Sequence, residues 1–249
     1  METREFLKWL LPHKGVIVLG LEPISGGWKQ VEHLTIDDAA DAMLEADKTG
    51  KTNVYMSVNR FKSTSRKQGN VAACRAIFDD YDVKPGTDGH YQDKPEALRD
   101  IIKLSKALQL SPTIVDSGGG FHVYYHLDDD IDENTWNELS ELKRTVTKHL
   151  ELKVDRACDT DSARVLRAPG THNYKPKYGK PLPVKLVKQG KTYAVDKIRT
   201  ALDSYIEANP AKMYFGQDDG NGDYKPALDR GAVAKAAMRG EDWHDNMLR

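Results

Sequence analysis

Cysteine, long apolar runs and net charge are all scarce in this chain, and each scarcity excludes a class of protein. Its 249 residues contain two cysteines, Cys74 and Cys158, whose spacing fits no metal site, so we expect a reduced protein without cysteine-bound zinc. No stretch of about 18 apolar residues occurs, which excludes a membrane-spanning helix. Residues 1–11 lack the basic leader and unbroken apolar core of a signal peptide. The sequence therefore predicts a cytoplasmic protein with no membrane partner.

The formal net charge is only −1 at pH 7, which does not favour a protein that coats nucleic acid through bulk electrostatics. Basic residues are nevertheless clustered, first at Arg60, Lys62, Arg66 and Lys67, and then at Lys175, Lys177, Lys180, Lys185, Lys188 and Lys191. Clusters within a neutral protein suit a local groove that follows a phosphate backbone. An ordinary solvated surface is the alternative.

The order of expected elements predicts a mixed α+β protein. Strands are expected at 16–21, 53–58, 75–83, 113–116 and 121–127, and helices at 36–46, 95–108 and 133–150. A small hairpin is expected from 184–187 and 193–195, turning at Gln189 and Gly190. We expect residues 1–208 to form one domain, 209–226 a linker and 227–249 a helical tail. That tail is expected to be the start of a further helical domain of a longer natural protein.

The first chemical motif is an Asp-x-Asp pair at the end of an apolar run. Asp80 and Asp82 are two residues apart on an expected strand, so their carboxylates project from the same face. Two such charges repel unless a cation lies between them, and oxygen ligands suit Mg²⁺ or Mn²⁺. Asp79 would point to the opposite face and is not expected to be a ligand. The alternative is an acidic strand end without a metal.

The second motif, residues 117–122, is a serine, three glycines, a phenylalanine and a histidine. Glycines allow the backbone to approach a phosphate closely, and their N–H groups form an anion-binding concavity. Ser117 and His122 could add donors to phosphate oxygens. The alternative is a glycine hairpin with a half-buried histidine. His126, about 13 Å along the same strand, is too far from His122 for a shared metal.

The third motif contains Asp155, Asp161, Arg164 and Arg167, followed by a turn at 168–171. Arginine clamps triphosphate oxygens with paired hydrogen bonds. On a strand Arg164 and Arg167 would face opposite sides, so we expect only one of them to reach a substrate. Asp161 is expected to be the structural partner of Arg164.

The order of these three motifs resembles the archaeo-eukaryotic primase superfamily, and more narrowly the primase-polymerase domains of phages and plasmids. The resemblance covers about residues 53–175, and the run from Arg164 to Lys175 is its most specific part. It implies a catalytic sheet related to RNA-recognition modules, packed with an N-terminal α/β unit. It also implies DNA-templated nucleotidyl transfer with two Mg²⁺ or Mn²⁺ ions. The zinc-binding element common in the family is missing from this chain.

The resemblance assigns roles to individual residues. Asp80, Asp82 and Asp155 would be the catalytic, metal-binding carboxylates. Nucleotide contacts would come from Ser117, Gly119, His122, Arg164, Arg167 and Lys175. Arg60, Arg66, Lys67 and Lys177 are the candidates for contacts with a single-stranded DNA template. The other expected partners are an NTP or dNTP and a helicase, carried in the full-length protein or supplied separately, in a phage- or plasmid-encoded system of a bacterial or archaeal host.

Two other functions remain as alternatives. A replication-initiator nuclease would use Tyr124 or Tyr125 as its nucleophile, but the His-apolar-His triplet of such enzymes is missing. A non-catalytic single-strand-binding module would need aromatic rings on an open sheet face. Tyr124 and Tyr125 are adjacent and would face opposite sides, and such a module has no use for three carboxylates.

Overall fold

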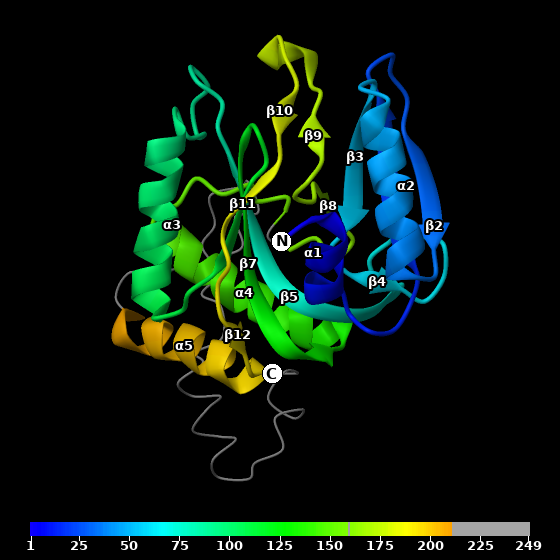
Figure 1. The fold of residues 1–249 in the computed structure, drawn as a ribbon. Coiled ribbons are helices and arrows are strands. Elements are labelled where there is room, and N and C mark those ends of the chain that lie inside the picture. The colour runs from blue at the N-terminus through cyan, green and yellow to red at the C-terminus, as the bar shows by residue number, and fades with distance from the viewer. Residues whose placement is uncertain (159, 211–249) are drawn as a thin grey trace, which may run out of the picture. The chain divides into compact units, whose positions relative to one another are not determined.

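The computed structural model describes residues 1–158 and 160–210, and residues 1–208 form one compact unit (Figure 1). The predicted tail 227–249, and all of the predicted linker 209–226 except its first two residues, lie outside the described residues. No helix in the described part of the chain is long and apolar enough to cross a membrane.

An N-terminal α/β unit is built around a four-stranded antiparallel sheet. Its strands lie in the order β2 (Lys29–His33), β1 (Ile17–Pro23), β3 (Thr52–Ser57) and β8 (Val165–Leu166). Helix α2 (Ile36–Lys48) packs on this sheet, and α1 (Thr3–Leu10) packs against α2. Thr35 caps α2, because its hydroxyl accepts a hydrogen bond from the Asp38 N–H at 3.1 Å. The predicted helix and its cap are confirmed.

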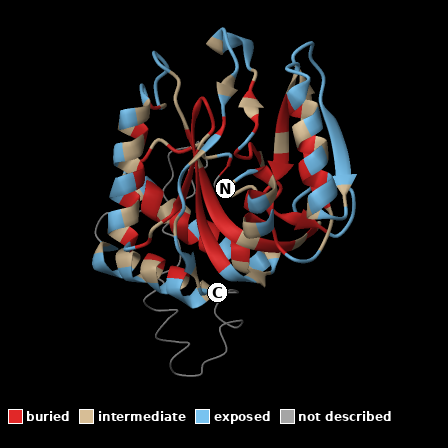
Figure 2. Cartoon of the chain, in the orientation of Figure 1, coloured by how far each residue is buried: buried red, intermediate tan, exposed pale blue. Residues whose placement is uncertain are grey.

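The larger sheet carries the predicted motifs. Its strands run β11 (Lys185–Lys188), β6 (Thr113–Asp116), β7 (Gly120–Ile131), β5 (Val71–Asp82) and β4 (Arg60–Phe61), and β12 (Thr192–Tyr193) pairs with β7. Helices α3 (Lys94–Leu108) and α4 (Glu133–His149) pack along it, and α5 (Val195–Ala208) contacts both (Figure 1). Strands β5 and β7 are mostly buried, whereas β2 is exposed (Figure 2). The expected α+β fold is confirmed.

A third, small sheet pairs β9 (His172–Asn173) with β10 (Leu182–Pro183), and the one-turn helix η1 (Pro176–Tyr178) lies between them in the chain. The predicted hairpin at 184–195 is wrong. Strand β11 pairs with β6, and β12 pairs in parallel with β7. Gly190 approaches the backbone at Ser111 and Pro112 so closely that a β-carbon would lie 2.3 Å from both. This close contact lies between β11 and β12, where the chain passes from pairing with β6 to pairing with β7.

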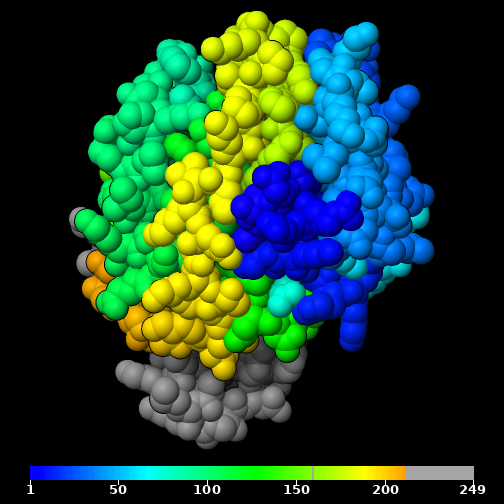
Figure 3. Space-filling view, viewed as in Figure 1, coloured from blue at the N-terminus to red at the C-terminus, as the bar shows by residue number. Residues whose placement is uncertain are grey.

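Helix α1 is seated on the face shown in Figure 3, between α2 and the segment that contains β11 and β12. Its Trp9 ring stacks on His126 of β7, with the ring centroids 4.2 Å apart. The hydroxyl of Thr3 donates to the Pro169 carbonyl at 2.7 Å. The N-terminal helix therefore ties the two larger sheets together, and the predicted motifs lie between them.

Candidate active site

A cavity of about 370 Å³ brings together all nine residues predicted to be catalytic or nucleotide-binding. Its lining includes Asp80, Asp82, Ser117, Gly119, His122, Asp155, Arg164, Arg167 and Lys175. These residues come from β5, β7 and the loops that flank β6, β8 and β9. Segments up to 95 residues apart in the chain, from Asp80 to Lys175, thus meet in one polar cleft.

Strand β5 places its aspartates on alternate faces, as predicted. Asp80 and Asp82 line the cleft, whereas Asp79 lies fully buried and paired with Lys143 of α4 at 2.6 Å. The Oδ1 atom of Asp80 is buried without a hydrogen-bond partner among the described residues. Burial, reinforced by the nearby charges of Asp82 and Asp155, raises the pKa of Asp80 to about 7. Asp80 is therefore a carboxylate that lacks a compensating cation.

The other two carboxylates already have cationic partners. Burial would raise the pKa of Asp82, but the Lys84 ammonium at 2.8 Å outweighs it and holds that pKa below its usual value. Asp155 accepts a hydrogen bond from Arg164 at 2.5 Å, and its backbone N–H donates to the Asp80 carbonyl at 2.9 Å. No group of three His, Cys, Asp or Glu residues forms a ready-made metal site within 1–158 and 160–210.

Arg164 pairs with two carboxylates. The expected ion pair with Asp161 is present at 4.0 Å, and Asp155 lies closer, at 2.5 Å. Asp161 also accepts a hydrogen bond from the Ala163 N–H at 3.0 Å, which closes a local turn. The sequence therefore predicted one partner of Arg164 and missed the closer one.

Arg164 and Arg167 both line the cavity, although strand alternation predicted that only one of them would reach it. Strand β8 is only two residues long, so the alternation does not extend across both arginines. Arg167 is buried and donates to the Tyr55 hydroxyl at 2.7 Å, with its guanidinium carbon 4.4 Å from the Tyr55 ring centroid. Asn53 accepts a further hydrogen bond from it at 3.1 Å.

His122 lies opposite Asp80 in the register of β5 and β7, with Nε2 4.0 Å from Asp80 Oδ1. Burial, followed by the charge of Arg167, lowers the pKa of His122 to about 3. The imidazole is therefore neutral at pH 7 and can donate one hydrogen bond without bringing a charge into the cleft. It borders the cavity directly.

The predicted glycine turn joins β6 to β7 as expected. Gly118 has a positive φ of 82°, a conformation that favours glycine. A β-carbon on Gly119 would lie 2.0 Å from the Tyr178 hydroxyl, so glycine also lets the loop after β9 close over the turn. Ser117 is buried beneath, where its carbonyl accepts a hydrogen bond from the Asn173 side chain at 3.1 Å.

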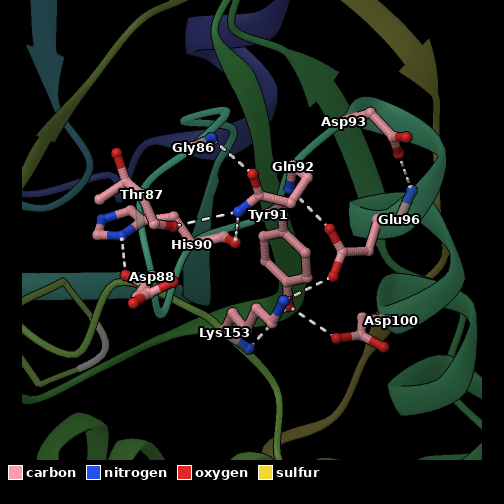
Figure 4. A network of polar contacts seen from close by, with 10 residues as sticks. All are labelled: Gly86, Thr87, Asp88, His90, Tyr91, Gln92, Asp93, Glu96, Asp100 and Lys153. Atoms are coloured by element: carbon pink, nitrogen blue, oxygen red, sulfur yellow. Dashed lines mark hydrogen bonds and ion pairs between the residues drawn. The ribbon is translucent and has the colours of Figure 1, made fainter.

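A polar network holds the loop after β5 and the segment before Asp155 in place (Figure 4). The Tyr91 hydroxyl donates to Asp100 at 3.0 Å and accepts from the Lys153 N–H at 2.9 Å. The Lys153 ammonium donates to Glu96 of α3 at 2.7 Å. Since Lys153 is two residues before Asp155, these contacts with α3 fix the chain that presents Asp155.

Of the four template candidates, the structure brings two into the cleft. Arg66 and Lys177 line it. Lys67 is not part of its lining. The prediction that Arg60 contacts the template is wrong, because its guanidinium is buried and donates to the carbonyls of His13 and Gly15. The basic cluster at 60–67 is therefore divided among the interior (Arg60), the cleft (Arg66) and the exposed surface (Lys62 and Lys67).

Neither alternative function gains support from the tyrosines. Tyr124 and Tyr125 are fully buried, and burial raises the pKa of both phenols well above the usual value. A nucleophile must meet its substrate, and a stacking platform needs an exposed ring. Neither tyrosine meets these requirements.

Several lining residues were missed from the sequence. Trp28, Tyr55 and Lys84 border the cleft, as do Asn173 and Tyr178. Lys84 could have been proposed from its spacing after Asp82. Asn173 lies within the run from Arg164 to Lys175, but no role was assigned to it. Trp28, Tyr55 and Tyr178 lie outside the motifs, so only the fold brings them to the cleft.

Several solved structures share this fold at low sequence identity. The primase-polymerase domain of cyanophage S-2L matches over 81% of this chain and 96% of its own, with a TM-score of 0.56 and 14% identity. The primase RepB′ matches over 95% of this chain and 67% of its own, with a TM-score of 0.54 and 13% identity. The RepB′ catalytic domain, solved in complex with initiator DNA, matches over 85% of this chain and 100% of its own (TM-score 0.53, 15% identity).

No family model and no curated protein sequence matches the chain. The structural likeness therefore establishes what the sequence motifs predicted at the level of architecture: residues 1–208 have the fold of archaeo-eukaryotic primase catalytic domains.

Proposed function

We propose that this protein is a DNA-templated primase-polymerase that joins nucleotides by attack of a 3′-hydroxyl on an incoming nucleoside triphosphate. The observation that carries the proposal is the composition of the cleft. Asp80 and Asp82, the former without a cationic partner, share one cavity with Arg164, Arg167 and Lys175. Carboxylates on one side and guanidinium and ammonium groups on the other suit a metal-assisted reaction of a triphosphate. The fold supports the same proposal.

The carboxylates fit a divalent cation. Asp80 has a buried oxygen without a hydrogen-bond partner among the described residues, and burial, followed by the charges of Asp82 and Asp155, raises its pKa. Asp80 and Asp82, with Asp155, would hold two Mg²⁺ or Mn²⁺ ions, which when bound activate the 3′-hydroxyl and stabilise the leaving pyrophosphate. Lys84 and Arg164 would then have to share Asp82 and Asp155 with these cations.

The basic side of the cleft would bind the triphosphate. Arg167 is held rigidly by Tyr55 and Asn53, which orients its remaining N–H groups. Burial, followed by the charge of Arg167, lowers the pKa of Lys175, and a phosphate beside its ammonium would offset the repulsion from Arg167. Neutral His122 would donate to a phosphate oxygen from the floor of the cleft.

The template would enter along the rim that Arg66 and Lys177 border. Arg66 donates to the Ala163 carbonyl, which holds it beside the cleft. The RepB′ catalytic domain binds initiator DNA in its solved complex, and we propose a single-stranded DNA template for the present chain. A helicase partner remains a proposal. The predicted linker at 209–226 also remains a prediction, because only its first two residues are described.

The test is incorporation of labelled nucleotides on single-stranded DNA, with and without an annealed primer, in Mg²⁺ and in Mn²⁺. Native protein should form product, and Asp82→Asn should form none. Asp128→Asn, at an exposed site toward the other end of β7, is the matched control and should behave as native. Product from Asp82→Asn, or none from a folded native protein with a primer supplied, would contradict the proposal.

A further inference from the structure

One exposed aromatic ring borders the cleft without a role in the chemistry above. Trp28, directly before β2, lines the same cavity as Asp80 and Asp82, and 41% of its surface is exposed. The two other tryptophans within the described residues have packing roles, since Trp136 is fully buried and Trp9 stacks on His126. A large aromatic ring that is exposed to water at the edge of a polar cavity can pack against a bound ligand.

The ring is held in position by its neighbours. A β-carbon on Gly20 of β1 would lie 2.3 Å from the Cη2 atom of Trp28, so only glycine leaves room for the ring over β1. The ring also contacts Tyr55, the cross-strand neighbour of Gly20, with centroids 5.6 Å apart and planes inclined at 42°. The Arg66 guanidinium lies 6.0 Å from the Trp28 centroid. Fixed rings cost little conformational entropy when they bind a flat ligand.

The surroundings of Trp28 point to the kind of ligand. The ring of Trp28 contacts the ring of Tyr55, and the Arg167 guanidinium lies over the Tyr55 ring. Arg167 belongs to the side of the cleft that we propose for the triphosphate. A molecule that fills this path needs an anionic end at Arg167 and a flat, π-bearing end at Trp28. Every nucleobase has such a π-face, and a guanidinium beside the ring adds a cation–π contribution.

We propose that Trp28 is the stacking platform for a nucleobase, seated by Gly20 and flanked by Arg66. The proposal deepens the proposed function and rests on it. The base belongs either to the incoming nucleotide or to the template strand, which offer the same chemistry to the ring. Base–aromatic stacking tolerates any sequence, so the platform would bind all four bases.

The experiment measures tryptophan fluorescence and binding in Ca²⁺, where no turnover is required. Native protein is titrated with a dNTP, with a single-stranded oligonucleotide, and with inorganic tripolyphosphate, which has the phosphates but no base. The part of the quenching that disappears in Trp28→Phe reports on Trp28. Quenching by the dNTP identifies the incoming base as the partner, quenching by the oligonucleotide identifies the template base, and tripolyphosphate should quench in neither protein.

Three variants complete the test. Trp28→Ala should weaken binding of the identified ligand about 5- to 100-fold and leave tripolyphosphate affinity unchanged. Trp28→Phe should retain most of the affinity. Gly20→Ala keeps the ring but displaces it, and should weaken binding in the same direction as Trp28→Ala. Trp9→Phe, which alters the ring stacked on His126 outside the cleft lining, is the matched control.

The outcomes separate this proposal from the function on which it rests. Equal affinity of native and Trp28→Ala proteins for the dNTP and the oligonucleotide, with tripolyphosphate bound, would overturn the platform and leave the proposed function standing. A folded native protein that binds none of the three ligands would overturn both.

Discussion

The two faces of strand β5 carry the same residue type under opposite conditions. On the inner face Asp79 is fully buried against Lys143 of α4, which also donates to the Phe78 carbonyl. On the outer face Asp80 borders the cleft, and its buried oxygen has no partner among the described residues. Asp79 is paired with a lysine of the protein, whereas Asp80 Oδ1 has no such partner among the described residues. The adjacent aspartates therefore lie in different environments, and the one without a partner is the one for which we propose a cation.

The largest expected effect is on the outer face. Asp80→Asn should reduce nucleotide incorporation by more than about 1000-fold, equivalent to about 4 kcal/mol in the barrier, because a carboxamide cannot replace a carboxylate as a cation ligand. Its free energy of unfolding in urea, measured without divalent cations, should be at or above the native value, since a buried unpaired charge has been removed. If Asp80→Asn lost activity only because it unfolds, the contrast between the two faces of β5 would not hold.

The inner face should give the reverse result. Lys143→Met leaves Asp79 as a buried charge without its cation, which should lower the free energy of unfolding by about 3–5 kcal/mol. The double variant Lys143→Met/Asp79→Asn removes the stranded charge and should recover a large part of that loss. Urea denaturation followed by circular dichroism measures both. Native stability in the single variant would contradict the structural role of the pair.

Strand β7, which pairs with β5, gives a pH-dependent test. Burial, followed by the charge of Arg75, lowers the pKa of His126 to about 4, against about 6.5 in an unfolded chain. Between these values the unfolded state binds more protons, so stability is complete above pH 6.5 and is lost as the pH falls toward 4. The loss should be about 1–3 kcal/mol once solvent screening is allowed for.

Chemical denaturation at pH 7 and pH 5 checks this expectation. His126→Gln has no proton to take up, so its stability should fall less between the two pH values than that of the native protein. Trp9 and Thr192, which contact the imidazole in the native protein, are left unchanged. An identical pH dependence in both proteins would show that other groups control acid stability.

The smallest effect is expected at the start of α4, the helix that carries Lys143. The Asp132 side chain accepts a hydrogen bond from the Thr135 N–H at 2.8 Å and caps this helix. Asp132→Ala should lower the free energy of unfolding by about 1 kcal/mol and leave nucleotide incorporation unchanged. Thermal denaturation alongside the incorporation assay measures both. A loss of nucleotide incorporation at a temperature where the variant is still folded would mean that α4 affects the cleft directly.

The sequence predicted best where a local rule decides the geometry. Alternation along a strand separated Asp79 from Asp80 and Asp82 correctly, because β5 is a regular strand through this stretch. The same rule failed for Arg164 and Arg167, because β8 is only two residues long and loops place both side chains. The predicted strands and helices around the motifs are present for the same local reasons.

Tertiary contacts explain what was missed. Helix α5 was not predicted, because only Ile198 and Leu202 of its apolar residues are buried and the stripe is short. Trp28 follows a glycine turn and precedes an exposed strand, which is typical of a surface loop. Its place at the cleft depends on how the sheet that contains β1 and β3 faces the sheet that contains β5, which no local pattern encodes. Arg60 was misplaced because its position within a basic run gave no sign of its burial.

Contacts at Asp155, Arg164 and Val165 link the two larger sheets. The Asp155 N–H donates to the Asp80 carbonyl of β5, Val165 pairs with Ser57 of β3, and Arg164 forms an ion pair with Asp155. Helix α1 is a second link between the same sheets. A substrate that changed the angle between the sheets would therefore strain the Asp155–Arg164 ion pair and shift a carboxylate that lines the cleft.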